Sequence, residues 1–76
     1  MPFTSEVAIS FELPGEGRVQ LDIFDATGTL LSSSHAVYPS GLNEISVTDL
    51  AQRPSGFYWY ILRAGDMTAQ GKLGKR

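Results

Sequence analysis

The sequence predicts an all-β fold, an immunoglobulin-like antiparallel β-sandwich of six to seven short strands. Three observations support this prediction. Apolar and polar residues alternate along several short runs, turn sequences follow one another about every 10–15 residues, and helical periodicity is nearly absent. Only residues 48–52 have the composition of a single helical turn, with Thr48 placed to cap it.

Alternation with a period of two defines the predicted strands, because successive side chains of a strand point to opposite faces of the sheet. Residues 7–13 are apolar at every odd position, and residues 18–23 repeat the pattern with Val19, Leu21 and Ile23 facing inward. Further strands are predicted at residues 29–37, 42–47, 57–63 and 67–73. The residues that share one face of the last strand are Met67, Ala69 and Leu73.

Turn sequences separate the predicted strands. Asp25-Ala26-Thr27-Gly28 has the aspartate first and the glycine fourth, which is the preference of a type I turn followed by a residue with positive φ. Pro-Ser-Gly occurs at residues 39–41 and again at 54–56, where proline fixes φ at the second turn position. Residues 14–17 and 64–66 supply the two remaining turns.

The composition indicates one small domain, residues 1–76, without covalent cross-links. The chain has no cysteine and one histidine, which excludes a disulfide scaffold and a zinc site built from nitrogen and sulfur ligands. Its net charge of −2 argues against a nucleic-acid-binding protein, because such a protein usually carries a basic face. No apolar stretch approaches the roughly 20 residues of a membrane span, so we expect no insertion into a membrane.

Residue types that could perform catalysis are present, but not in the patterns that catalysis needs. Ser32-Ser33-Ser34 stand beside His35, yet no Gly-x-Ser-x-Gly elbow is present to hold a nucleophilic serine. Gly15-Glu16-Gly17 lacks the third glycine and the following helix of a phosphate-binding loop. Four carboxylates lack the dense spacing of a calcium loop, namely Asp22, Asp25, Asp49 and Asp66. We therefore predict a protein that is not an enzyme and has no cofactor or metal, with a peripheral calcium ion as the alternative.

Several short motifs follow one another through the whole chain. They are Pro2-Phe3, Ile9-Ser10-Phe11-Glu12-Leu13-Pro14, Gly17-x-Val19-x-Leu21-x-Ile23-Phe24-Asp25-x-x-Gly28 and Pro54-Ser55-Gly56-Phe57-Tyr58. In this order and spacing the chain resembles the C-terminal sorting domain of substrates of the type IX (Por) secretion system. That family is related to the immunoglobulin-like domain of flagellar hook-capping proteins.

The two ends of the chain depart from the pattern of that family. Met1 stands where the family usually has an asparagine before Pro2-Phe3. Family members tend to end with two lysines and alternating apolar residues, whereas residues 71–76 contain one apolar residue and two glycines.

The resemblance implies that the domain is the C-terminal part of a larger secreted protein and acts as the sorting signal of that protein. The attached cargo would reach the periplasm by a separate leader, and outer-membrane secretion machinery would then recognise the folded domain and carry the cargo to the cell surface or beyond. An accessible last strand suits this role, because its unpaired backbone groups can be captured by strand addition. The tail residues in the position of the family's recognition segment are Lys72, Leu73, Lys75 and Arg76.

The aromatic run at residues 57–61 leaves two alternatives open. Members of the family that the chain resembles usually place the positions of Tyr58, Tyr60 and Leu62 inward. This would leave Phe57, Trp59 and Ile61 on an unusually apolar outer face. This face would pack against a cargo domain or a second copy of the chain, as in a self-assembling structural domain. Alternatively it binds polysaccharide, because flat rings stack on sugars. The second alternative would make the chain a carbohydrate-binding or spacer module of a secreted glycoside hydrolase.

Overall fold

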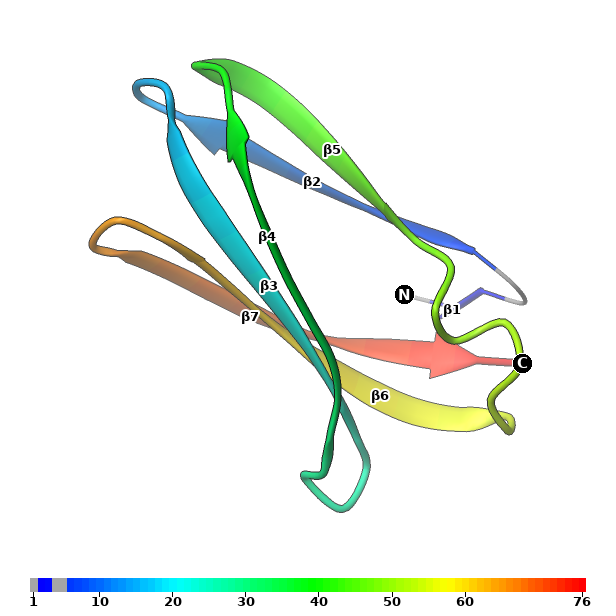
Figure 1. The fold of residues 1–76 in the computed structure, drawn as a ribbon. Coiled ribbons are helices and arrows are strands. Elements are labelled where there is room, and N and C mark those ends of the chain that lie inside the picture. The colour runs from blue at the N-terminus through cyan, green and yellow to red at the C-terminus, as the bar shows by residue number, and fades with distance from the viewer. Residues whose placement is uncertain (1, 4–5) are drawn as a thin grey trace.

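The computed structural model describes residues 2–3 and 6–76 of the chain. Over this range the chain forms seven strands and no helix (Figure 1). The strands are β1 (Pro2–Phe3), β2 (Val7–Leu13), β3 (Gly17–Asp25), β4 (Leu30–Tyr38), β5 (Gly41–Val47), β6 (Gly56–Ala64) and β7 (Met67–Lys75). The strands from β2 to β7 agree with the six predicted runs to within two residues at each end.

The strands form two sheets of unequal size. The larger sheet has the order β1-β7-β6-β3-β4, and the smaller sheet contains β2 and β5. Figure 1 shows the β2–β5 pair crossing over one face of the larger sheet, so the predicted β-sandwich is confirmed. All pairs are antiparallel except β1 and β7, which run parallel. The alternation pattern did not predict β1, because two residues are too few to show a period.

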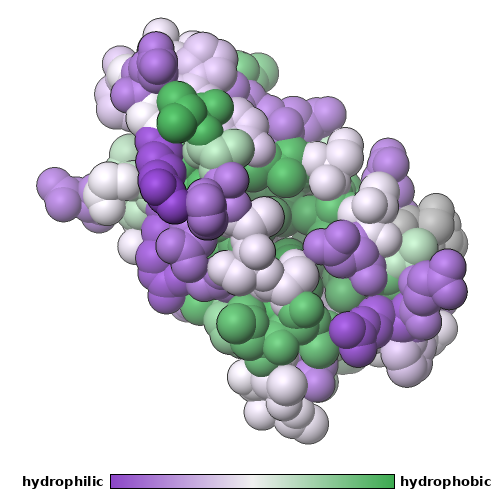
Figure 2. All heavy atoms as spheres, viewed as in Figure 1, coloured by the Kyte–Doolittle hydropathy of each residue, from purple (hydrophilic) through white to green (hydrophobic). Residues whose placement is uncertain are grey.

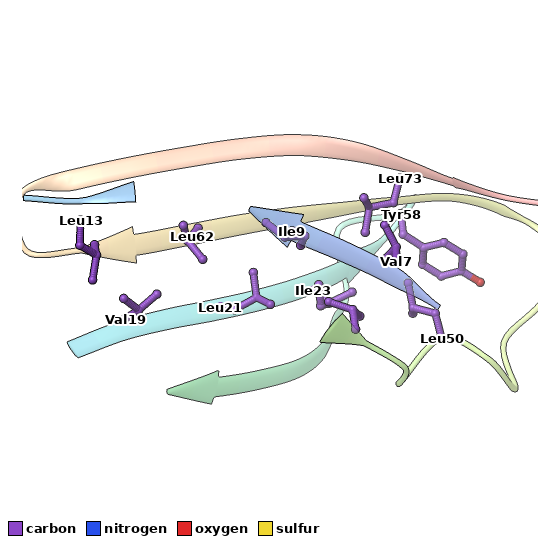
Figure 3. Close-up of a cluster of buried hydrophobic side chains, with 11 residues drawn as sticks. Val7, Ile9, Leu13, Val19, Leu21, Ile23, Leu50, Tyr58, Leu62 and Leu73 are labelled. Carbon is purple, nitrogen blue, oxygen red and sulfur yellow. The ribbon is translucent and has the colours of Figure 1, made fainter. Parts of the chain in front are cut away.

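Side chains from both sheets meet in one apolar core (Figure 3). From β3, Val19, Leu21 and Ile23 are at most 4% exposed, as the alternation predicted. The other buried apolar residues are Val7, Ile9, Leu13, Val47, Leu50, Tyr58, Leu62 and Leu73. Burying a large aliphatic side chain stabilises a protein by roughly 1.5–3 kcal/mol. This cluster is therefore the main source of stability in a chain that has no cysteine.

The turn between β3 and β4 has the geometry that its sequence predicted. The N–H of Gly28 donates to the C=O of Asp25 at 3.0 Å, and Gly28 has a φ of 90°. The Thr27 hydroxyl donates to the Asp25 carboxylate at 2.6 Å, and the N–H groups of Thr29 and Thr27 donate to the same oxygen. These hydrogen bonds hold the pKa of Asp25 below its usual value, and the bond from the Thr27 hydroxyl has the largest effect.

The segment between β5 and β6 forms turns, and the helical turn predicted at residues 48–52 does not form. The N–H of Ala51 donates to the C=O of Thr48, and the N–H of Arg53 donates to the C=O of Leu50. Both bonds connect residues three apart, as in turns, and not four apart, as in an α-helix. Leu50 is only 1% exposed, and its burial in the core fixes the path of a segment too short to nucleate a stable helix.

The smaller sheet covers only part of the larger one. On β7, Leu73 is fully buried, whereas Met67 is 49% exposed and Ala69 is exposed on the same face. On the opposite flank, Figure 2 shows apolar surface in the hollow between the sheets near β4 and β5, where Leu21 and Ile45 line a small pocket. Two strands cannot cover a five-stranded sheet, so both flanks of the sandwich are open.

Candidate recognition site

The last strand, β7, lies one position in from the edge of the larger sheet. It pairs with β6 along its whole length, and on its other side β1 pairs only with Gly74 and Lys75. Among the described residues, no strand lies beside residues 67–73 on that side. We call residues 67–71 the open edge of β7. The last strand was predicted to be an accessible edge strand. It is open only over its first part, because β1 pairs with Gly74 and Lys75 at the tail.

The predicted tail residues occupy different environments. Lys72 and Arg76 are exposed. Leu73 is fully buried, because the odd-numbered residues of β7 face the smaller sheet. Its side chain cannot touch a receptor while the domain is folded, so the structure corrects the contact role predicted for Leu73 to a role in the core.

Lys75 holds the end of β7 against the segment between β5 and β6. Its ammonium group donates to the backbone C=O of Ala51 at 3.2 Å and to that of Arg53. Its side chain is half-buried in this position. Lys75 therefore has a structural role in the fold, which leaves Lys72 and Arg76 as the most accessible cations of the tail.

The aromatic residues predicted on the outer face of β6 lie there. Phe57 is 56% exposed, Trp59 is 44% exposed and Ile61 is half-buried. The ammonium group of Lys72 lies 3.9 Å from the centroid of the Phe57 ring and 5.8 Å from that of the Trp59 ring. Such a cation–π contact stabilises by roughly 0.5–1 kcal/mol at an exposed site. The structure thus joins two separately predicted groups in one surface, the aromatic–lysine surface of Phe57, Trp59 and Lys72.

The turn between β6 and β7 contains the signal that predicts this contact. Gly65 has a φ of 59° and is the first of two residues between the strands, which is the glycine-first pattern of a type II′ hairpin turn. A two-residue turn fixes the register of the strands that it joins. With Ala64 opposite Met67, Trp59 must lie opposite Lys72, as it does. The register could therefore have been derived from the sequence.

A polar cluster lies further along the same outer face. Asp22 is 7% exposed and accepts hydrogen bonds from the Ser33 hydroxyl at 2.6 Å and from Gln20 at 3.2 Å. The guanidinium of Arg63 forms an ion pair with Asp22 at 2.8 Å. The hydrogen bond from Ser33, and then those from Gln20 and Arg63, hold the pKa of Asp22 below its usual value, although burial opposes this shift. The cluster joins β4, β3 and β6, and residues so far apart in sequence gave no local pattern.

The family of the chain is decided by comparison with protein-family models. The model of the secretion system C-terminal sorting domain matches residues 1–75. The chain belongs to this family. It is a sorting domain, which directs an attached cargo protein to type IX secretion, as the motifs implied. No curated protein and no solved structure gives a match.

The family match supports the sorting function and gives no support to the carbohydrate-binding alternative. On the aromatic–lysine surface, the ammonium group of Lys72 lies over the Phe57 ring, while Phe57 and Trp59 remain 56% and 44% exposed. In the sorting domain this surface adjoins the open edge of β7, because Lys72 directly follows Gly71 on the same strand.

His35 and Ser33 of β4 are engaged in side-chain contacts. Nδ1 of His35 lies 2.9 Å from the guanidinium of Arg18, and because arginine has only donors, the histidine accepts this bond. The Ser33 hydroxyl donates to Asp22. Within residues 2–3 and 6–76, no three histidine, cysteine or acidic side chains gather in a group that could hold a metal ion. Over the same residues, no helix has the length and apolar character needed to cross a membrane.

Proposed function

We propose that proteins of the outer-membrane secretion machinery recognise this sorting domain in its folded form, at the basic end of β7. The domain, residues 1–76, is the C-terminal part of a larger secreted protein. That protein reaches the periplasm first, and recognition of its sorting domain then takes it across the outer membrane to the cell surface or the medium. The domain acts by binding alone and performs no catalysis.

The observation that supports this proposal is that two of the four tail residues have structural contacts within the domain, whereas the other two are exposed. Leu73 and Lys75 are used by the fold itself, in the core and against the segment between β5 and β6. Lys72 and Arg76 are exposed on β7 and directly after it. Two accessible cations on a rigid strand end give a partner a fixed charge pattern that an unfolded tail would lack.

The test uses charge reversal and not deletion. Removing residues 72–76 would also remove Leu73 and unfold the domain, so loss of secretion would not separate recognition from folding. The double variant Lys72→Glu, Arg76→Glu leaves the core side chains in place. Its control is Arg18→Glu, which reverses one exposed cation on β3, away from the tail, and removes only the contact of Arg18 with His35.

A fluorescent reporter with an export leader and this domain at its C-terminus is expressed in a bacterium with type IX machinery. We expect the double variant to remain in the periplasm while the wild type and the Arg18→Glu control are secreted. Thermal unfolding of the purified domains checks that all three are folded. Normal secretion of a folded double variant would contradict the proposal.

A further inference from the structure

We propose that the domain forms a weak homodimer, in which the β4 strands of two copies pair antiparallel to each other about Ser34. This inference goes beyond the proposed function, because it concerns the opposite edge of the larger sheet and involves no secretion machinery. In the order β1-β7-β6-β3-β4, two strands separate β4 from β7 (Figure 1). Pairing through β4 would therefore not cover the tail of either copy.

The strand β4 has one side free for pairing. It pairs with β3 on one side, and among the residues that the structure describes no strand pairs with it on the other. A free strand edge presents backbone N–H and C=O groups with which a second strand can pair. Since β4 has nine residues, this row of groups is about 30 Å long.

The β4 edge lacks the features that usually prevent such pairing. Edge strands are commonly protected by charged side chains, by prolines or by being short. Residues 30–38 contain no lysine, arginine, carboxylate or proline. A bulge interrupts the pairing with β3 near Leu30, whereas residues 32–38 pair with β3 in continuous register. Two copies of this edge can therefore meet about a two-fold axis without bringing like charges of β4 together.

The sequence of β4 is suited to pairing with its own reverse. Leucines occupy residues 30–31 at its start, Val37-Tyr38 end it, and three serines, a histidine and an alanine lie between. Antiparallel pairing about Ser34 would place the apolar start of one copy beside the apolar end of the other. It would bury part of Leu30 and Val37, which are 53% and 64% exposed in the single chain.

The charges beside the edge favour the same register. On the outer face, the guanidinium of Arg18 lies 2.9 Å from His35. Asp22 accepts a hydrogen bond from Ser33. His35 and Ser33 lie on either side of Ser34, so the proposed pairing places His35 of each copy opposite Ser33 of the other and brings Arg18 of one copy toward Asp22 of the other. Because Asp22 already has an arginine partner within the domain, this attraction affects the register more than the affinity.

The size of the contact predicts a weak dimer. A strip about 30 Å long and one strand wide covers less than the roughly 1,200–2,000 Å² of a stable interface. The two five-stranded sheets would join into one continuous sheet, while the two smaller sheets would stay apart. We therefore expect association only at high protein concentration.

The experiment measures sedimentation of the purified domain from about 10 µM to about 1 mM, a range that covers weak association. Ser34 is exposed, so the single chain can accept a charged side chain there. Ser34→Glu and Ser34→Lys each bring two like charges together at the centre of the pairing, and we expect each to weaken the dimer by about tenfold or more. An equimolar mixture of the two variants should associate again, because opposite charges then meet. Amide exchange within residues 32–36 should slow as the wild type dimerises.

The matched control is Trp59→Lys, which adds the same charge on the outer face of β6 and should leave the dimer unchanged. Amide spectra check that every variant is folded. A wild type that remains monomeric at about 1 mM, a dimer that both Ser34 variants retain, or a mixture that does not associate would overturn the inference. Loss of the dimer in Trp59→Lys would also overturn it, since the contact would then lie on the aromatic–lysine surface.

Discussion

The ring of Tyr60 fills the space beside Gly71 on the neighbouring strand. The two residues are a cross-strand pair of β6 and β7, and a Cβ on Gly71 would lie 2.8 Å from the Tyr60 hydroxyl oxygen. Tyr60 is half-buried and packs against the core. The packing of the Tyr60 ring therefore explains why residue 71 of the tail is a glycine and not a larger residue.

We expect Gly71→Ala to destabilise the domain by about 1–3 kcal/mol, because the added methyl group must displace the Tyr60 ring. In a Tyr60→Leu background the same change should cost at least about 0.5 kcal/mol less, since the ring is gone. Urea unfolding of the four proteins measures both values. An equal cost in the two backgrounds would mean that the pair is not coupled.

Leu21→Ala is expected to cost about 2–5 kcal/mol, because Leu21 is 4% exposed in the centre of the core. In a domain of 76 residues this is a large part of the total stability. Leu42→Ala removes the same atoms from a side chain that is 79% exposed and should change stability by less than about 0.5 kcal/mol. Thermal unfolding distinguishes the two variants, and similar effects would show that the inner face of β3 is misassigned.

The ionised Asp22 should stabilise the fold at neutral pH. Its pKa is lower in the folded state than in the unfolded state, so its contribution is present above the unfolded value of about 3.8 and is lost as the pH falls through the folded value. We expect the melting temperature of the wild type to fall below about pH 4 more steeply than that of Asp22→Asn. Ser33→Ala removes the strongest cause of the shift and should move this acid transition to higher pH. Parallel pH profiles for all three proteins would rule out a role for Asp22.

Tyr58→Phe should cost about 1 kcal/mol and loosen the segment between β5 and β6. The Tyr58 hydroxyl donates to the C=O of Pro54 at 2.6 Å, and the change leaves that carbonyl without this donor. Hydrogen exchange should accelerate at residues 50–53, where turn bonds and Leu50 hold the segment. Unchanged exchange in this segment would show that other contacts hold it.

Much of the fold could be predicted because alternation and turn chemistry are local properties. The inner face of β3 follows from its period of two, and the turn at residues 25–28 follows from an aspartate and a glycine at set positions. The structure differs where tertiary packing decides. Burial of Leu50 turned a predicted helical turn into two turns, and β1 depends on its pairing with the end of β7.

The site was predicted in part for the same reason. Phe57 and Trp59 lie on the outer face that the family pattern implied for them, and the register of the hairpin explains their contact with Lys72. Leu73 was placed in the recognition tail because of the family pattern, while its odd position on β7 puts it in the core. The polar cluster of Asp22, with its partners on three strands, required the folded structure.

If the proposed function is right, the folded domain alone is sufficient to send an attached protein across the outer membrane. The most direct measurement is the fraction of an exported reporter that reaches the medium or cell surface, with and without this domain, in a host that secretes its own type IX substrates at the same time. We expect secretion with the domain, and retention in the periplasm both without it and with the destabilised Leu21→Ala domain. Equal retention of the reporter with and without the folded domain, while the substrates of the host are secreted, would contradict it.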